Sequence, residues 1–288
     1  PIGEEEVLQK TRITNNTLPQ IYEAIFRPDG NAILMRSLEE NDVVKNMALA
    51  LTAPRATSAS TSSPQASEGL YEVSLSLLRG NIDSVAAAGN SLIYALKDNR
   101  AIASSNFNGD AVKTLWNSPF KSWRVGRFGN NYLLFTKPSA RLPGYAYSLT
   151  PQGALRKLLG PLNGLSVAAS PGGEFLLYSY TGGGLPRLFA EEVRRGAVSE
   201  VVPAPLSEKC AWSSRQRNNF FCGVPESGLG SDEPDGWYQG RTHFSDALWY
   251  FDALSQAATL MVKPQGEFGV AFDIYQPALS SDERYFIF

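Results

Sequence analysis

The chain has 288 residues, of which 43% are hydrophobic and 11% aromatic, so it is long enough to bury a large core. Its formal net charge is −2, from 26 basic and 28 acidic residues, and the basic residues form no concentrated stripe. This balance argues against nucleic acid or an anionic membrane surface as a partner. No apolar run approaches the roughly 20 residues that a transmembrane helix needs.

In chain order, short apolar runs alternate with turns rich in Gly, Pro, Asn and Ser, which predicts antiparallel β-hairpins throughout. The clearest hairpin is 165–180, where two apolar runs flank a Ser-Pro-Gly-Gly turn. Residues 53–69 are of low complexity and predict a surface loop. The predicted strands and hairpins lie at 3–14, 21–35, 43–51, 70–78, 82–96, 101–116, 123–135, 145–158, 165–180, 187–202, 209–222, 247–262 and 274–288.

These hairpins repeat with a regular period. Repeats begin at 82, 122, 164 and 209, so they are spaced by 40, 42 and 45 residues. Four strands in such a period are typical of a β-propeller. We therefore predict one all-β domain, 1–288, built as a propeller of four-stranded antiparallel blades. Six blades fit the spacing best, and seven fit if a blade lies outside the sequence.

The two ends of the chain are expected to share one blade. Strand 4–11 would complete the sheet that 274–288 begins and so protect its edges. The sequence has no initiator Met and ends within an apolar run, 285–288. We expect it to be part of a longer polypeptide, with an export signal or membrane anchor outside the given residues.

Two turns carry a family resemblance, Phe26-Arg27-Pro28-Asp29-Gly30 and Ala169-Ser170-Pro171-Gly172-Gly173. They resemble the repeats of TolB-like and WD40-like (PD40-type) propellers. The segments KCAWS (209–213), CGVP (222–225), WYQG (237–240) and FSD (244–246) look like a group of exported TolB-type propellers of environmental bacteria.

This resemblance covers nearly the whole chain. It implies an exported, often N-terminally anchored protein at the cell envelope, and it brings no established activity. The Gly-His and Trp-Asp pairs of true WD40 repeats are absent, which argues against WD40-type assembly roles.

Cys210 and Cys222 are the only cysteines, and they lie symmetrically about a turn near Gln216. In a regular hairpin they would face each other across adjacent strands. This predicts a cross-strand disulfide and an oxidising compartment. Two buried reduced thiols are the alternative. Two cysteines and one distant histidine do not make a usual metal site, and we predict neither a metal nor a cofactor.

The segment 224–246 is a long insertion in the fifth blade, and long loops often carry function. Calcium binding is disfavoured because its acids match no fixed calcium loop, so a solvated acidic loop is the alternative. Its aromatic pair would stack on a sugar or a partner, or pin the loop to the blade. The candidate binding residues are Glu226, Asp232, Glu233, Asp235, Trp237, Tyr238 and His243.

No Gly-x-Ser-x-Gly elbow or HExxH motif is present, and His243 is the single histidine. The sequence therefore favours a non-catalytic, exported scaffold that binds a protein or an envelope component. The alternative is a glycan-active hydrolase or lyase that uses carboxylates at the channel mouth. Acids, arginines and tyrosines converging at one end of the channel would favour the enzyme, and a small apolar lining would count against it. A propeller fragment of a larger peptidase would need a hydrolase domain outside the given residues.

Overall fold

The computed structural model describes residues 20–39, 43–52, 72–98 and 100–288. Within these ranges five four-stranded antiparallel sheets form, and the strands of each sheet follow one another in chain order. We number the sheets as blades 1 to 5. Blade 1 contains β1 (Ile21–Phe26), β2 (Ala32–Leu38), β3 (Val44–Thr52) and β4 (Glu72–Leu77). Blade 2 contains β5 (Ile82–Ala88), β6 (Ser91–Leu96), β7 (Ala101–Asn106) and β8 (Lys113–Asn117).

The other three blades have the same arrangement. Blade 3 contains β9 (Trp123–Phe128), β10 (Asn131–Thr136), β11 (Pro143–Leu149) and β12 (Leu155–Asn163). Blade 4 contains β13 (Ser166–Ala169), β14 (Phe175–Gly182), β15 (Leu185–Glu192) and β16 (Ala197–Val201). Blade 5 contains β17 (Cys210–Trp212), β18 (Asn219–Pro225), β19 (Asp246–Asp252) and β20 (Ala258–Val262).

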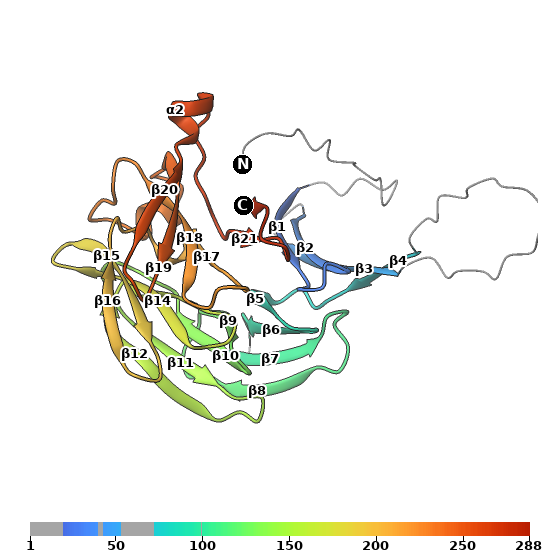
Figure 1. Ribbon diagram of the computed structural model, residues 1–288. Coiled ribbons are helices and arrows are strands. Elements are labelled where there is room, and N and C mark those ends of the chain that lie inside the picture. Colours follow the sequence, from blue (N-terminus) through green and yellow to red (C-terminus); the bar gives the residue numbers. More distant parts are fainter. Residues whose placement is uncertain (1–19, 40–42, 53–71, 99) are drawn as a thin grey trace, which may run out of the picture.

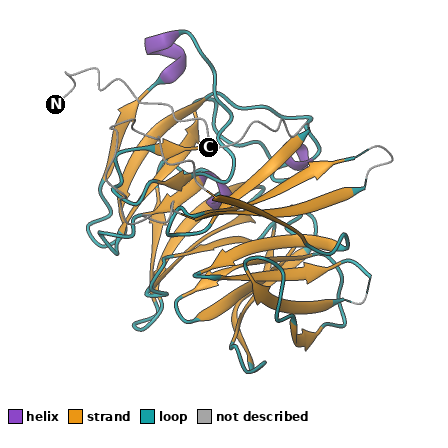
Figure 2. Cartoon of the chain, turned by 90° about the vertical axis from the view of Figure 1, so that its right-hand side faces the viewer, coloured by secondary structure: helices purple, strands orange, loops and turns teal. Residues whose placement is uncertain are grey.

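The blades surround a common centre, and the first strands of neighbouring blades contact one another there (Figure 1). The predicted all-β propeller of four-stranded antiparallel blades is confirmed. Short helical segments lie in the connections between strands (Figure 2): η1 (Ser207–Lys209), α1 (Asp235–Tyr238) and α2 (Pro264–Phe268). No helix of the described residues is long and apolar enough to span a membrane.

The predicted count of six or seven blades is wrong. After blade 5 the chain forms only a two-stranded sheet, β21 (Ala278–Leu279) with β22 (Phe286–Ile287). Residues 263–277 form α2 and an irregular segment, and no further four-stranded sheet follows among the described residues. The expected partner strand, 4–11, and the expected surface loop, 53–69, lie outside the described residues.

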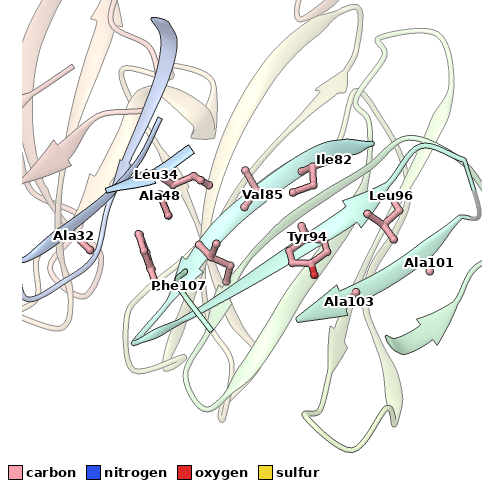
Figure 3. Close-up of a cluster of buried hydrophobic side chains, with 11 residues drawn as sticks. Ala32, Leu34, Ala48, Ile82, Val85, Tyr94, Leu96, Ala101, Ala103 and Phe107 are labelled. Atoms are coloured by element: carbon pink, nitrogen blue, oxygen red, sulfur yellow. The ribbon is translucent and has the colours of Figure 1, made fainter. Parts of the chain in front are cut away.

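Apolar side chains fill the spaces between adjacent blades. Between blades 1 and 2, Leu34 and Ala48 pack against Val85 and Tyr94 (Figure 3). Similar clusters lie between each later pair of blades up to blade 5. Because strand residues alternate in direction, each blade offers one apolar face to each neighbour.

A close approach of backbones also joins blades 3 and 4. Gly129 has a φ of 57°, and a Cβ atom there would lie 2.7 Å from the carbonyl oxygen of Gly172. Glycine is therefore required where these two turns meet.

Candidate functional site

The blade 5 insertion folds across one end of the propeller. The backbone N–H of Ala140, in blade 3, donates to Asp235 at 2.6 Å. The hydroxyl of Thr181, in blade 4, donates to the carbonyl oxygen of Glu233 at 3.4 Å. The insertion therefore reaches two other blades besides its own.

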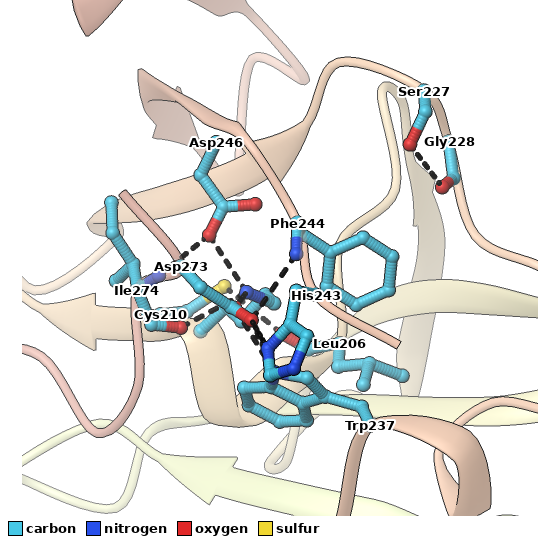
Figure 4. A network of polar contacts seen from close by, with 11 residues as sticks. Leu206, Cys210, Ser227, Gly228, Trp237, His243, Phe244, Asp246, Asp273 and Ile274 are labelled. Carbon is cyan, nitrogen blue, oxygen red and sulfur yellow. Dashed lines mark hydrogen bonds and ion pairs between the residues drawn. The ribbon is translucent and has the colours of Figure 1, made fainter. Parts of the chain in front are cut away.

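A buried lysine anchors this arrangement. The Lys209 ammonium is fully buried and donates to Asp246 at 2.7 Å, to Asp273 at 2.6 Å and to the carbonyl oxygen of Ile274 at 3.0 Å. It also lies 4.5 Å from the ring centre of Trp237. Figure 4 shows Asp246, Asp273 and Trp237 gathered at this point. These contacts tie blade 5, the insertion and the C-terminal segment together.

Of the predicted site residues, Trp237 and Tyr238 line one pocket, which is described below, and the other five contact partners elsewhere in the insertion or beside it. Among the described residues no group of three or more His, Cys, Asp or Glu side chains could hold a metal ion. Trp237 is pinned, because its indole N–H donates to Asp273 at 3.0 Å. The other contacts are Glu226 with Lys263, Asp232 with Arg241, Glu233 with the Trp237 N–H, Asp235 with Ala140 and the exposed His243 with Asp273.

Tyr238 lies in a pocket at the side of the central channel. Its hydroxyl donates to the carboxylate of Glu208, on η1. Both residues line a side pocket of about 340 Å³, whose walls are Arg124, Lys137, Glu208, Trp237, Tyr238 and Tyr275. Arg124, Glu208 and Tyr275 also line the central pocket, which has a volume of about 780 Å³. The insertion thus forms one wall of a cavity that adjoins the central channel.

The lining of the central pocket includes both small apolar side chains and charged or tyrosine side chains. Its inner strands contribute small apolar side chains such as Val85, Val125 and Ala168. Acids, arginines and tyrosines also converge there, and they are Tyr22, Glu23, Arg36, Asp83, Arg124, Arg127, Glu208 and Tyr275. The enzyme alternative therefore keeps a physical basis.

Arg36 and Arg124 differ in their hydrogen bonding. The Arg36 guanidinium donates to Glu23 at 2.7 Å, to Asn46 at 3.0 Å and to the carbonyl oxygen of Ile82 at 3.0 Å. It therefore holds blade 1 to blade 2. The Arg124 guanidinium is half-buried and forms no hydrogen bond or ion pair within the described part of the chain. It remains available to a ligand.

The environment alters the acid–base properties of the side pocket. Burial raises the pKa of Glu208, although the Tyr238 hydroxyl and the Arg124 charge oppose this. Burial and the Glu208 charge raise the pKa of Tyr238 well above its usual value. Burial raises the pKa of Tyr275 to about 12. Both tyrosines are therefore neutral hydrogen-bond donors at neutral pH.

Comparison with solved structures identifies the fold. TolB from Acinetobacter baumannii superposes with a TM-score of 0.56 at 14% identity, over 90% of this chain and 56% of that one. A putative TolB from Agrobacterium tumefaciens gives 0.52 at 10% identity, over 92% and 87%. The chain has a TolB-like propeller fold. The GH74 enzyme of Niastella koreensis gives 0.52 at 9% identity, over 83% and 38%. No family model and no curated protein matches the sequence.

The TolB-like propeller contains the predicted disulfide. Cys210 of β17 and Cys222 of β18 lie directly opposite each other and are bonded. The disulfide therefore joins the innermost two strands of blade 5, and Cys210 lines the central pocket.

Sequence reasoning missed the residues that line the side pocket from outside the insertion, namely Arg124, Lys137, Glu208 and Tyr275. One signal could have found Arg124. When the repeats are aligned on their starts, Arg124 stands where blades 2 and 4 have Ser84 and Ser166. A long cation in place of a small residue on an innermost strand marks a position that faces the channel.

Proposed function

We propose that the protein is a non-catalytic binding propeller, which receives a ligand or a segment of a partner protein in its central channel. The observation that carries this proposal is the open central pocket of about 780 Å³, whose lining includes charged and tyrosine side chains. Pockets with an apolar wall and a few convergent polar groups are the usual form of a binding site.

We place this activity outside the cytoplasm, at the cell envelope. The Cys210–Cys222 disulfide supports this location, because such bonds persist in oxidising compartments. The TolB-like fold supports a protein partner, since that fold presents several sets of loops around one axis.

Site-specific photo-crosslinking tests the proposal. A benzoylphenylalanine at Gln276, an exposed residue of the pocket wall, should crosslink to one envelope species in native cells. The matched control at Thr259, an exposed residue of the outer strand β20, should not. Crosslinking at 259 alone, or at neither position, would contradict binding in the channel.

A glycan-active enzyme is the second candidate, favoured by the Glu208 carboxyl. This group lies at the junction of both pockets, and its raised pKa suits a general acid. Incubation with a polysaccharide panel should then release reducing ends, and Glu208→Gln should lower the rate by about 100-fold or more. Unchanged turnover in Glu208→Gln, or no turnover on any polysaccharide, would remove this candidate.

A further inference from the structure

The side pocket suggests a chemical class of ligand. We propose that it binds a sugar ring that carries a carboxylate, with the carboxylate held by Arg124 and Lys137 and the ring placed against the aromatic walls. This inference rests on the proposed binding function and adds the ligand class to it. Its first support is the wall composition, which combines two cations, one carboxylate and three aromatic rings.

Both cations come from blade 3. Arg124 of β9 pairs with Phe135 of β10, and Lys137 follows two residues after Phe135. Lys137 lies one residue beyond the end of β10, and both side chains line the side pocket. Neither side chain forms a hydrogen bond or ion pair with any described residue. A planar guanidinium beside an ammonium suits a carboxylate.

The aromatic walls are held in place before a ligand arrives. Trp237 is fixed by Asp273 and by the cation of Lys209, and Tyr238 is fixed by Glu208. The ring of Tyr275 lies 5.4 Å from that of Trp237, at 78° to it. Rings that are already ordered lose little entropy on binding, and the tyrosine hydroxyls add polar contacts for sugar hydroxyls.

The charges decide between ligand classes. Aromatic rings beside a carboxylate also form cages for quaternary ammonium groups. Here, however, such a ligand would lie beside Arg124 and Lys137 and be repelled. A neutral sugar would leave both cations without a partner. The negative charge of Glu208 would repel an anionic ligand, but the two positive charges of Arg124 and Lys137 outnumber it. The raised pKa of Glu208 favours its neutral form and so weakens this repulsion.

Isothermal titration with a matched pair of disaccharides tests the ligand class. Cellobiouronic acid should bind, and cellobiose, which has a hydroxymethyl group in place of the carboxylate, should bind at least about tenfold more weakly, as expected for charge-assisted hydrogen bonds. Acetate tests whether a free carboxylate suffices, and choline tests the aromatic-cage alternative. Equal affinities for the two disaccharides, acetate as tight as the uronate, or choline binding would overturn the inference.

Variants locate the binding. Arg124→Ala and Lys137→Ala should each weaken cellobiouronic acid binding by about tenfold, and Glu208→Gln should not weaken it. Arg156→Ala, which removes an exposed arginine of the outer strand β12, should leave the affinity unchanged. Full affinity in Arg124→Ala would contradict the assignment. If crosslinking at Gln276 succeeds while no acidic sugar binds, only the ligand class fails, whereas loss of that crosslink removes the binding function itself.

Discussion

Lys209 shows how one residue holds the site together. Its ammonium is surrounded by two carboxylates, a carbonyl oxygen and two aromatic rings, and its side chain has no exposure to water. Removing one partner of a buried ion pair leaves an uncompensated charge, which costs more than the pair contributes. Asp246, whose side chain is also fully buried, would then be left without its main counter-charge.

Lys209→Met should lower the free energy of unfolding by about 3–5 kcal/mol, measured by urea denaturation. Lys263→Met, at an exposed lysine, should change it by less than about 1 kcal/mol. Burial already raises the pKa of Asp246, and losing the cation raises it further. A folded-state pKa above the unfolded value contributes stability at low pH that is lost as pH rises. The Lys209→Met defect should therefore be smaller at pH 5 than at pH 8, and a defect independent of pH would contradict this account.

The disulfide is the second feature at this scale. Cys210 and Cys222 are separated by 12 positions, and a loop of this size implies about 3 kcal/mol of stabilisation through the unfolded chain. The double variant Cys210→Ser, Cys222→Ser should lose this amount in urea denaturation. Dithiothreitol should lower the stability of the wild type equally and leave the double variant unchanged. A reductant effect on the variant would show that the loss does not come from this bond.

At the scale of elements, the β21–β22 hairpin is attached to blade 5 through Glu283. Its carboxylate accepts hydrogen bonds from the Ser213 hydroxyl and from the backbone N–H groups of Ser214 and Arg215. Burial raises the pKa of Glu283, but these hydrogen bonds outweigh it, and the pKa lies below its usual value. A lowered carboxyl pKa contributes stability above the unfolded value, about 4.3, and that stability is lost at lower pH.

Glu283→Ala should therefore loosen the hairpin. We expect amide exchange in 278–287 to become about fivefold faster at pH 7, with little change at pH 3, where the wild-type contact is itself weakened. Glu39→Ala, which removes an exposed carboxylate from the edge of blade 1, serves as the control and should leave this exchange unchanged. Equal exchange in the Glu283 variant and the wild type at pH 7 would show that other contacts hold the hairpin.

The sequence predicts the individual hairpins better than it predicts the candidate site. Hairpins such as 165–180 are set by local turn chemistry, so their strands could be predicted, as could the opposed cysteines. The side pocket joins Arg124, Glu208, Tyr238 and Tyr275 from four separate segments, and no spacing within one segment indicates that they meet. The acids of the insertion were conspicuous because they cluster in sequence, yet the fold gives them separate partners, such as the Ala140 N–H of blade 3 for Asp235.

At the scale of the whole molecule, the number of blades could not be predicted from spacing along the sequence either. A repeat period predicts that units exist, but it does not show which of them form complete sheets. After blade 5 the described residues form α2 and a two-stranded sheet. Blades 1 to 5 nevertheless bring their inner strands to one centre (Figure 1). The central pocket is lined by residues of these strands. The central claim is that binding takes place in this pocket.

The most direct measurement blocks the pocket. Gln276→Cys and Thr259→Cys variants, each modified with a bulky maleimide, would be immobilised and compared for retention of the envelope species that crosslinks at position 276. The account predicts that the adduct at 276 reduces retention by about tenfold or more, while the adduct at 259 leaves it unchanged. Equal retention by both adducts, or loss only with the adduct at 259, would contradict it.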